Sequence, residues 1–399
     1  MRDELTKTVL YFENGVGFGG AVISLRTFLD FSDNERFRPV LVHSLSDRKF
    51  ETFAPDVKTI HLPRISLGQD GAGNLARKAN VDVFTYAARL AAIARAERAD
   101  CLYLNNDLVT NLPGMIAGRL LGLPIIQHER DIPAPISRLA TSVARHATRL
   151  LAISTPVRQA LESMGFPPER IRMVPEGLDL AQYEPAAAED IQRVRQELGI
   201  ARDEKVVVLV GMVMDWKGQH VLIDAAPKVL RRHRDTKILI VGESPPGGDG
   251  YLNQLKSQIG DLGLSEKVVL SGYRSDIPTV LQAADVVVHA STSPEPFGRV
   301  VIEGMVMRRP VIATAIGAPP EIIRHGETGY LVPPGDPEAL ADMIVKLFDH
   351  PEIAANLGDA ARREVLRKYS IQRHAHLVES VFEEIFWRTP PALPAVLMA

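Results

Sequence analysis

VVVLVGMVMDWKGQHVLIDAAPKVLRRHRDTKILIVGE, residues 206–243, decides the fold class of this 399-residue chain. Residues 206–213 form an apolar run, as is typical of a central strand in a parallel sheet. Residues 219–233 have the apolar spacing of a helix, and 237–243 is again a short apolar run. A strand, a helix and a second strand in this order predict two strands of a parallel sheet with a helix covering it.

The same alternation extends in both directions along the chain. Helical segments separate further short apolar runs, which lie at 8–13, 39–44, 101–106, 124–129, 150–154, 267–273, 285–291 and 310–315. We therefore predict an α/β protein with two Rossmann-like, doubly wound parallel-sheet domains that face each other across a cleft, followed by C-terminal helices. Because ligands bind at the carboxyl ends of such strands, we expect the site in this cleft.

The domain boundaries follow from composition. Residues 178–204 are polar and alanine-rich, so we predict an interdomain linker there between domains at 1–177 and 205–370. We assign 371–399 to a C-terminal helix that packs back toward the first domain, and to a tail.

Composition narrows the class of protein. Hydrophobic residues make up 46% and charged residues 24%, as in ordinary globular proteins. The formal net charge of -3 argues against a nucleic-acid-binding protein. A single cysteine, Cys101, excludes a disulfide within the chain and fits a reducing compartment. Because no apolar run is long enough to span a membrane and the N-terminus lacks a signal-peptide pattern, we expect a cytoplasmic protein.

SPEPFGRVVIEGM, residues 293–305, is the strongest chemical motif. It follows an apolar strand and places Glu295 and Glu303 eight residues apart around Gly298. We expect a helix to begin near Gly298, and its free backbone N–H groups would favour a phosphate. Glu295 then precedes the helix and Glu303 lies within it, so the two could reach opposite ends of one extended ligand. Taken alone, two such glutamates would more often be a loop residue and a solvated helix residue.

GMVMDWKGQH, residues 211–220, lies between a strand and a helix. Lys217 stands where a lysine can meet a diphosphate at a strand's carboxyl end. A charge-assisted hydrogen bond there would contribute roughly 1.5–3 kcal/mol. The alternative is a surface lysine in a loop.

ENGVGFGGAV, residues 13–22, matches G-x-G-x-x-G through Gly15, Gly17 and Gly20, and Asp47 ends the next strand. This pattern is compatible with dinucleotide binding, and hence with an NAD(P)-dependent oxidoreductase. It is equally compatible with a tight turn that lets a phosphate or an acceptor approach the first helix.

His128 ends an apolar strand in PIIQHERD, residues 124–131. We expect it to face the cleft from the side opposite Glu295. A structural role for this histidine is about as well supported as a functional one.

SRLATSVARHATRLLAI, residues 137–153, carries basic residues on an otherwise apolar helical pattern. The basic residues are Arg138, Arg145, His146 and Arg149. Such a helix could lie on an anionic membrane surface, or it could pack against the domain with its basic face in solvent.

Four segments, in order, resemble glycosyltransferase family 4, the retaining group 1 glycosyl transferases of the GT-B fold. They are VPEGLDLAQYEP at 174–185, GYRSDIPTVLQAAD at 272–285, SPEPFGRVVIEGMVMRRPVIAT at 293–314 and GAPPEIIRHGETGYLVPPGDPEAL at 317–340. The resemblance runs along nearly the whole chain and implies an acceptor-binding first domain and a nucleotide-sugar-binding second domain.

The resemblance also assigns roles. Glu295 would contact the hydroxyls of the donor sugar, Glu303 the ribose, and Lys217 the diphosphate. His128 would approach the transferred sugar. The remaining donor-binding positions are Gly298, Arg299 and Val300 for the phosphates, Tyr273, Arg274 and Ile277 for the base, and Gly19 and Gly20 for the phosphate and acceptor.

Two positions depart from the family pattern. Met212 stands where the family usually has an arginine, five residues before the phosphate-binding lysine. We hypothesise that Arg299 or Arg274 compensates for the missing charge. Glu176 stands where the family has an asparagine. A carboxylate beside a diphosphate is unfavourable, so we expect Glu176 to point elsewhere.

The reaction implied is transfer of a sugar, with retention, from a UDP- or GDP-sugar to a glycan or lipid-linked acceptor, in cell-envelope or exopolysaccharide synthesis. No Asp-rich metal motif is present in the sequence, and we expect no metal or other cofactor. A peripheral contact with the inner face of the membrane would suit a lipid-linked acceptor. Besides the oxidoreductase, a non-catalytic nucleotide-sugar-binding protein remains an alternative, because Met212 removes a charge that the family uses.

Overall fold

The computed structural model describes residues 6–15, 19–44, 56–63, 75–245 and 247–387; for residues 75–81 it describes the backbone alone. The chain divides into two compact units. Unit 1 comprises residues 1–177 and 371–399, and unit 2 comprises residues 178–370.

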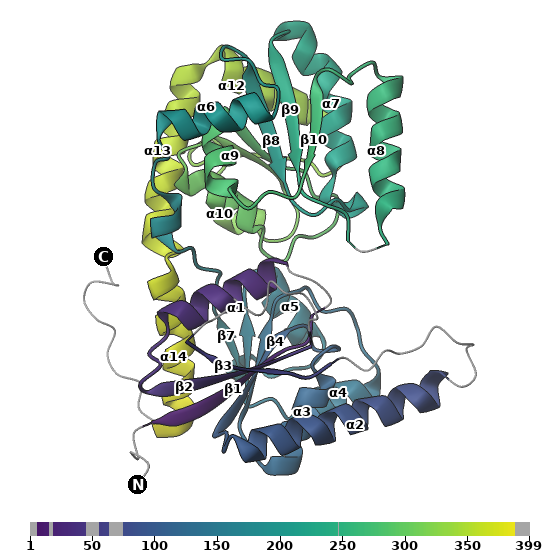
Figure 1. Ribbon diagram of the computed structural model, residues 1–399, viewed down its shortest axis with the longest axis vertical. Coiled ribbons are helices and arrows are strands. Elements are labelled where there is room, and N and C mark those ends of the chain that lie inside the picture. Colours follow the sequence, from purple (N-terminus) through teal and green to yellow (C-terminus); the bar gives the residue numbers. More distant parts are fainter. Residues whose placement is uncertain (1–5, 16–18, 45–55, 64–74, 246, 388–399) are drawn as a thin grey trace. The chain divides into compact units, whose positions relative to one another are not determined.

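Unit 1 has a parallel sheet flanked by helices (Figure 1). Its described residues form a seven-stranded sheet in the order β3-β2-β1-β4-β5-β6-β7. The elements are β1 (Lys7–Glu13), α1 (Gly20–Phe31), β2 (Phe37–His43), β3 (Lys58–His61), α2 (Leu75–Ala96), β4 (Cys101–Asn106), α3 (Leu112–Leu121), β5 (Ile125–Glu129), α4 (Arg138–Ala144), β6 (Arg149–Ala152), α5 (Thr155–Ser163), η2 (Pro168–Arg170), β7 (Ile171–Met173) and α14 (Ile371–Trp387).

The core of unit 1 joins the two ends of the chain. The β1 residue Tyr11 and the β4 residue Tyr103 lie with ring centroids 5.0 Å apart, and both are fully buried. Phe382, from α14, packs edge-on against Tyr103 at 6.0 Å. Because aromatic rings of this size bury large areas, α14 is an integral part of this core. Cys101, the lone cysteine, is buried in the same layer.

Unit 2 repeats the plan. Its described residues form a six-stranded parallel sheet in the order β10-β9-β8-β11-β12-β13. The elements are η3 (Leu180–Tyr183), α6 (Ala188–Glu197), β8 (Lys205–Val210), η4 (Asp215–Lys217), α7 (Gln219–Arg232), β9 (Thr236–Val241), α8 (Asp249–Asp261), β10 (Val268–Gly272), α9 (Ile277–Ala283), β11 (Val286–His289), α10 (Arg299–Val306), β12 (Val311–Thr314), α11 (Pro319–Ile322), β13 (Tyr330–Val332), α12 (Pro337–Asp349) and α13 (Pro351–Lys368).

The segment that decided the fold class behaves as its pattern predicts. Residues 206–209 of β8 are buried, as expected for a strand covered on both faces. Val221, Leu222, Ala225 and Val229 form the buried face of α7, which recurs at helical spacing. β8 and β9 pair in parallel from Lys205↔Thr236 to Val210↔Val241.

The structure also corrects several expectations. Residues 178–204, predicted as a linker, belong to unit 2, where η3 contacts α10 and α6 contacts α9. The helical pattern at 137–153 is interrupted, because α4 ends at Ala144 and Arg149 begins β6. The strands β3, β7 and β13 were not predicted. They are short strands of three or four residues at the sheet edges, and such runs carry little periodic signal.

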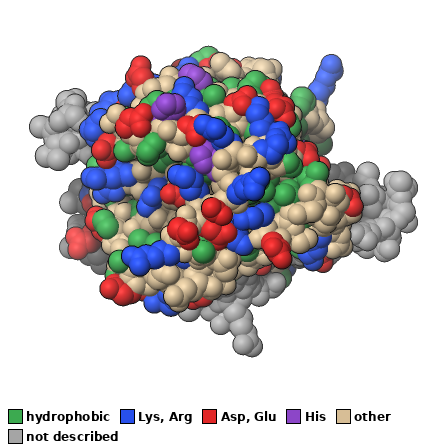
Figure 2. Space-filling model, turned by 90° about the horizontal axis from the view of Figure 1, so that it is seen from above, with side chains coloured by type: hydrophobic (Ala, Val, Ile, Leu, Met, Phe, Trp, Pro, Cys, Tyr) green, Lys and Arg blue, Asp and Glu red, His purple; other side chains and the backbone are tan. Residues whose placement is uncertain are grey.

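Charge is evenly mixed over the face shown in Figure 2, where Lys and Arg side chains alternate with Asp and Glu side chains. This pattern accords with a formal net charge of only -3. Within the described part of the chain, no helix is both long and apolar enough to cross a membrane.

Candidate functional site

Each sheet has one point where the strand order reverses. In unit 2 it lies between β8 and β11, and in unit 1 between β1 and β4. The loops that follow the two neighbouring strands diverge there, so a crevice opens at the carboxyl edge of the sheet, and ligands of doubly wound folds bind in it.

At the β8–β11 reversal a lysine and a glutamate meet. Lys217 ends η4, in the loop after β8, and Glu295 lies in the loop after β11. Lys217 Nζ donates to Glu295 Oε1 at 3.0 Å and to Oε2 at 2.8 Å. The Glu295 side chain is 7% exposed and that of Lys217 is 23% exposed. The pair therefore lies at the boundary between the protein interior and solvent.

Two polar side chains hold the carboxylate from behind, and a third supports one of them. Glu295 Oε2 accepts a hydrogen bond from Ser291 Oγ at 2.8 Å and lies 3.0 Å from His289 Nε2. Thr314 Oγ1, at the end of β12, donates to the carbonyl oxygen of Ser291 at 2.8 Å. These contacts fix the orientation of Glu295, so its position does not depend on a bound ligand.

The ionisation of Glu295 is set by these neighbours. Burial alone would raise the pKa of the carboxyl, but the charge of Lys217 and the hydrogen bond and charge of His289 outweigh it. Together they hold the pKa of Glu295 well below its usual range. Glu295 is therefore an anion throughout the neutral and mildly acidic range, and it can only accept hydrogen bonds.

Gly298 caps the start of α10 beside this pair. Its φ of +88° is in the left-handed region, and a Cβ there would lie 3.4 Å from Glu295 Cγ. The first turn of α10 carries no acidic residue, and Gly298 provides no side-chain cap. An anion is therefore favoured at this end of the helix, close to Lys217 and Glu295.

Glu303 lies one turn further along α10. Arg299 Nη2 is 3.4 Å from Glu303 Oε1, and the hydroxyl of Tyr183 interacts with both side chains. Burial, followed by the charge of Glu303, raises the pKa of Tyr183. Tyr183 thus remains protonated and fixes Glu303 and Arg299 in position.

The residues expected near the base lie along another part of the same edge. Tyr273, just after β10, is 53% exposed. Arg274 donates to Asp276 at 2.8 and 2.6 Å and to Glu197 at 2.9 Å. Ile277 begins α9. Arg274 is therefore held by two carboxylates and is a poor substitute for the charge missing at position 212.

In unit 1 the corresponding reversal is built around a buried glutamate. Glu13 ends β1, and its carboxylate accepts hydrogen bonds from Asn105 at 2.5 Å, from Asn106, and from the backbone N–H of Gly15 at 2.8 Å. Burial raises the pKa of Glu13, although these three donors oppose the shift. A Cβ on Gly15 would lie 2.7 Å from Glu13 Oε1, so a larger residue here would force this carboxylate to shift.

A buried ion pair adjoins this cluster. Arg130 Nη1 lies 2.7 Å from Glu176 Oε1 and 3.1 Å from Ser24 Oγ, and Arg130 Nε donates to Asn105 Oδ1 at 3.0 Å. Both side chains of the pair are 4% exposed. Ser24 also donates to Glu176. The pair thus links α1, β4 and the end of β5 to Glu176, which lies just before the chain enters unit 2.

His128 is enclosed within unit 1. It is fully buried, its Nδ1 is hydrogen-bonded to Tyr103, and its ring stacks on that of His374 with centroids 5.7 Å apart. Burial, then the charge of Arg130, lowers the pKa of His128, so the ring is neutral. Its Nε2 is buried without a hydrogen-bond partner among the described residues.

Comparison with known proteins identifies the family. The model of the family "Glycosyl transferases group 1" matches residues 190–364, and that of the "Glycosyl transferase 4-like domain" matches residues 35–177. The chain belongs to the group 1 glycosyltransferases.

Its relatives include spore coat protein SA of Bacillus subtilis, 31% identical over 59% of this chain and 65% of that one. The D-inositol 3-phosphate glycosyltransferase of Corynebacterium efficiens is 33% identical over 54% of this chain and 51% of that one. These alignments span less than two thirds of each relative. The Anabaena protein HepE, solved in complex with UDP and glucose, superposes with a TM-score of 0.83 at 27% identity, covering 95% of this chain and 100% of that one.

The two parallel-sheet units and the likeness to HepE confirm the predicted GT-B fold class. Within unit 2, the structure of this group 1 glycosyltransferase brings Lys217, Glu295 and Gly298 together, and it places Val300 in the first turn of α10. Gly19 and Gly20 lie at the start of α1 in unit 1. Gly17 and Asp47, on which the dinucleotide interpretation relied, lie outside the described residues.

Sequence reasoning missed several residues of this glycosyltransferase. In unit 2 they are His289, Ser291, Thr314 and Tyr183, and in unit 1 they are Ser24, Asn105 and Arg130. His289 and Thr314 end apolar strands, and a polar residue at that position is a signal that could have been used. Among the described residues, no three His, Cys, Asp or Glu side chains converge as ligands for a metal ion.

Proposed function

We propose that this protein transfers a sugar from a nucleotide-sugar donor to an acceptor, and that the donor binds at the β8–β11 edge of unit 2. The observation that carries the proposal is the Lys217–Glu295 pair beside the start of α10. It combines a cation, a fixed hydrogen-bond acceptor and a helix N-terminus within one crevice. HepE, solved with UDP-glucose, gives this donor class further support through its likeness to the chain.

The proposed roles follow from the chemistry of each group. Breaking the bond between sugar and phosphate puts negative charge on the nucleoside diphosphate and positive charge on the anomeric carbon. Lys217 and the start of α10 would stabilise the negative charge, because both are positioned before the reaction begins. Glu295, ionised and held by Ser291 and His289, would accept hydrogen bonds from sugar hydroxyls. Glu303 would accept those of the ribose.

We propose a retaining reaction without a metal ion, in which the departing phosphate accepts the proton of the acceptor hydroxyl. The Lys217 charge and the helix terminus would then supply the electrostatic stabilisation that a metal supplies elsewhere. For the donor we propose a UDP- or GDP-sugar. For the acceptor we propose a glycan or a lipid-linked glycan of the cell envelope or an exopolysaccharide, met in the cytoplasm at the inner face of the membrane.

The first experiment is a thermal-shift screen with UDP, GDP and ADP, their sugar conjugates, NAD and NADP. A ligand that binds only the folded protein raises Tm. The proposal expects a shift with one nucleoside diphosphate, which is lost in Glu303→Ala and kept in the control Glu266→Ala, an exposed glutamate of the same unit. A shift with NAD or NADP alone would refute the proposed donor class.

The reaction itself is tested with the donor that binds. ¹H NMR of the released or transferred sugar reports its first-formed anomer. The α anomer from an α-linked donor supports retention, and the β anomer excludes it. Full activity after treatment with EDTA supports a reaction without a metal ion. Absence of both hydrolysis and transfer, across a panel of lipid and glycan acceptors, would favour the non-catalytic binding protein.

A further inference from the structure

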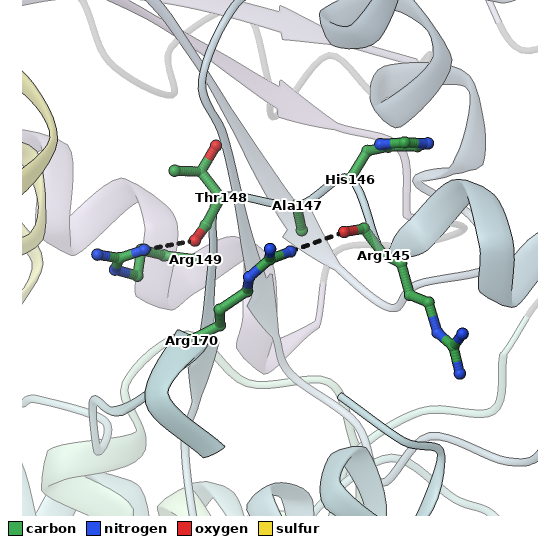
Figure 3. A pocket seen from close by; sticks show the side chains of 6 residues that line it. All are labelled: Arg145, His146, Ala147, Thr148, Arg149 and Arg170. Atoms are coloured by element: carbon green, nitrogen blue, oxygen red, sulfur yellow. Dashed lines mark hydrogen bonds between the residues drawn. The ribbon is translucent and has the colours of Figure 1, made fainter. Parts of the chain in front are cut away.

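A pocket lies at the other edge of the unit 1 sheet, away from the reversal at Glu13. Its lining residues come from two segments, the turn before β6 and the residue before β7 (Figure 3), and they are Arg145, His146, Ala147, Thr148, Arg149 and Arg170. Thr148 and Arg170 immediately precede their strands, so the pocket lies at the amino ends of β6 and β7. The reversal at Glu13 lies at the carboxyl edge. The pocket is therefore no part of the sites described above.

The lining is basic. Three of its six residues are arginines, one is a histidine, and none is acidic. Figure 3 shows Arg145 and Arg149 extending to opposite sides of Arg170. Arg149 and Arg172 share the carboxylate of Glu384. Among the described residues, neither Arg145 nor Arg170 forms an ion pair, so two positive charges at this pocket lack a partner.

Hydrogen bonds orient two of the side chains that line the pocket, those of Arg170 and His146. Arg170 Nη1 donates to the carbonyl oxygen of Arg145 at 2.9 Å, which holds the Arg170 guanidinium in place and leaves its other N–H groups available. Arg119 Nη1 lies 3.0 Å from His146 Nδ1. Since arginine can only donate, this contact makes Nδ1 the acceptor and places the imidazole proton on Nε2. Arg145, Arg170 and His146 are all exposed and thus accessible.

We propose that this pocket binds a phosphate group. Guanidinium groups bind phosphate oxygens in paired hydrogen bonds, and a small pocket lined by several arginines and no acid favours a compact, highly charged anion. The volume of about 330 Å³ is at the small end of ligand-binding pockets and suits one phosphorylated group. The phosphate has two sources to distinguish, a phospholipid headgroup and a free phosphorylated solute.

One observation bears on the source. Leu120, the residue after Arg119 at the end of α3, is 68% exposed. Its neighbour Arg119 contacts the lining residue His146, and an exposed leucine next to basic residues is a combination that peripheral membrane proteins present to a lipid surface. The first arm of the test therefore uses vesicles, and the second uses inorganic phosphate.

In the vesicle arm, the protein is co-sedimented with phosphatidylglycerol vesicles and with phosphatidylcholine vesicles. Each basic residue near an anionic surface strengthens binding about fivefold. We expect Arg145→Gln to weaken binding to phosphatidylglycerol about fivefold, and Arg145→Gln/Arg170→Gln about twenty-fivefold. The control Arg26→Gln/Arg231→Gln changes the net charge equally at two arginines outside the pocket and should change binding less than twofold.

In the solution arm, Tm is measured with sodium phosphate and with sodium chloride at equal ionic strength. Phosphate bound in unit 2 raises Tm equally in all these variants, so the difference between variant and wild type reports the pocket. A loss of part of the phosphate shift in the pocket variants, and not in the control, supports a site for free phosphate. Loss of vesicle binding alone supports the headgroup.

Either loss supports the proposal. The proposal is overturned if the pocket variants bind vesicles as strongly as wild type and control do, and also show the same phosphate-induced shift in Tm. If the double variant does not fold, Arg145→Gln carries the test, because the Arg145 side chain bonds to no described residue. Both arms omit the nucleotide sugar, so their outcome is independent of the proposed transferase function.

Discussion

Replacing Lys217 by methionine tests the pairing on which the candidate site depends. Methionine keeps much of the apolar length of the side chain and removes the ammonium group. Glu295 then loses two hydrogen bonds, of 3.0 and 2.8 Å, and keeps those from Ser291 and His289. Burial of Glu295 is no longer opposed by the lysine charge, so the pKa of the carboxyl rises.

The expected cost in stability follows from exposure. A hydrogen bond to a charged group contributes about 1.5–3 kcal/mol, and breaking a fully buried pair costs more. Lys217 is 23% exposed, so solvent weakens the contribution of this ion pair to stability, although Glu295 is almost fully buried. We therefore expect Lys217→Met to lower the free energy of unfolding by about 2 kcal/mol at neutral pH. Loss of transition-state stabilisation should lower kcat by about 10²–10³.

The pH dependence distinguishes charge from packing. In the wild type the pKa of Glu295 is depressed, so its contribution to stability is complete above the unfolded-state pKa of about 4.3 and is lost as the pH falls below it. In Lys217→Met the part of that contribution that comes from the lysine is removed at every pH, and the part from His289 remains. The difference in Tm between wild type and variant should therefore be greatest near pH 7 and should narrow below about pH 4.3.

The assay is a series of thermal melts from pH 7 to pH 3.5, with nucleoside diphosphate release as the activity readout. Lys228→Met is the matched control, because Lys228 also contacts two carboxylates, Glu338 at 2.8 Å and Asp342 at 2.6 Å, on an exposed surface. It should give a smaller shift in Tm and unchanged activity. A Tm difference for Lys217→Met that is the same at pH 7 and pH 3.5 would show that Lys217 acts through packing, and it would refute the electrostatic argument.

Three further predictions concern single positions. Arg299→Ala should lower kcat about tenfold or more if Arg299 supplies the charge missing at position 212, and an unchanged rate would exclude that compensation. Gly218→Ala and Gly199→Ala both place alanine at a positive φ, at 72° and 64°, but only the first puts a Cβ 1.9 Å from the carbonyl oxygen of Ala290. We expect Gly199→Ala to lower the free energy of unfolding by about 1 kcal/mol, because of backbone strain, and Gly218→Ala to lower it by several kcal/mol. Thermal melts of the two variants check this difference. Glu176→Gln should lower stability by about 3 kcal/mol because it leaves a buried arginine charge unpaired, and a shift in the urea midpoint no larger than that of an exposed glutamate variant would contradict this.

The sequence predicted the elements that carry their own signal. Residues 206–213 are apolar enough to specify a central strand, and Gly298 marks a helix start because only glycine adopts its φ of +88° without strain. Edge strands such as β3 have exposed residues and no such run, so they depend on pairing with a neighbour. Residues 137–153 have a helical pattern along their whole length, but only part of the segment is helical in the structure. Pairing with β5 draws Arg149 and the residues after it into the strand β6.

The contacts between distant residues could not be predicted in the same way. Nothing in the sequence near Glu176 indicates Arg130, which is 46 positions away, because ion pairs across a fold are set by three-dimensional packing. The structure accounts for the glutamate at 176, where we expected the side chain to point away from a diphosphate. It is neutralised by Arg130 within unit 1, and Ser24 supplies a further hydrogen bond.

The charge balance at the β8–β11 edge has a consequence for donor binding. In the free protein the charge of Lys217 is already satisfied by Glu295, and Met212 supplies none. A diphosphate must therefore compete with Glu295 for the lysine. The glutamate, which keeps its contacts with Ser291 and His289, can release the lysine only if sugar hydroxyls replace the hydrogen bonds that the lysine donates. Binding of the diphosphate and of the sugar would thus be coupled through one ion pair. The affinity for a nucleotide sugar should then exceed the affinity for the nucleoside diphosphate by more than the contacts of the sugar alone would give. Glu295→Gln should abolish this additional gain in affinity.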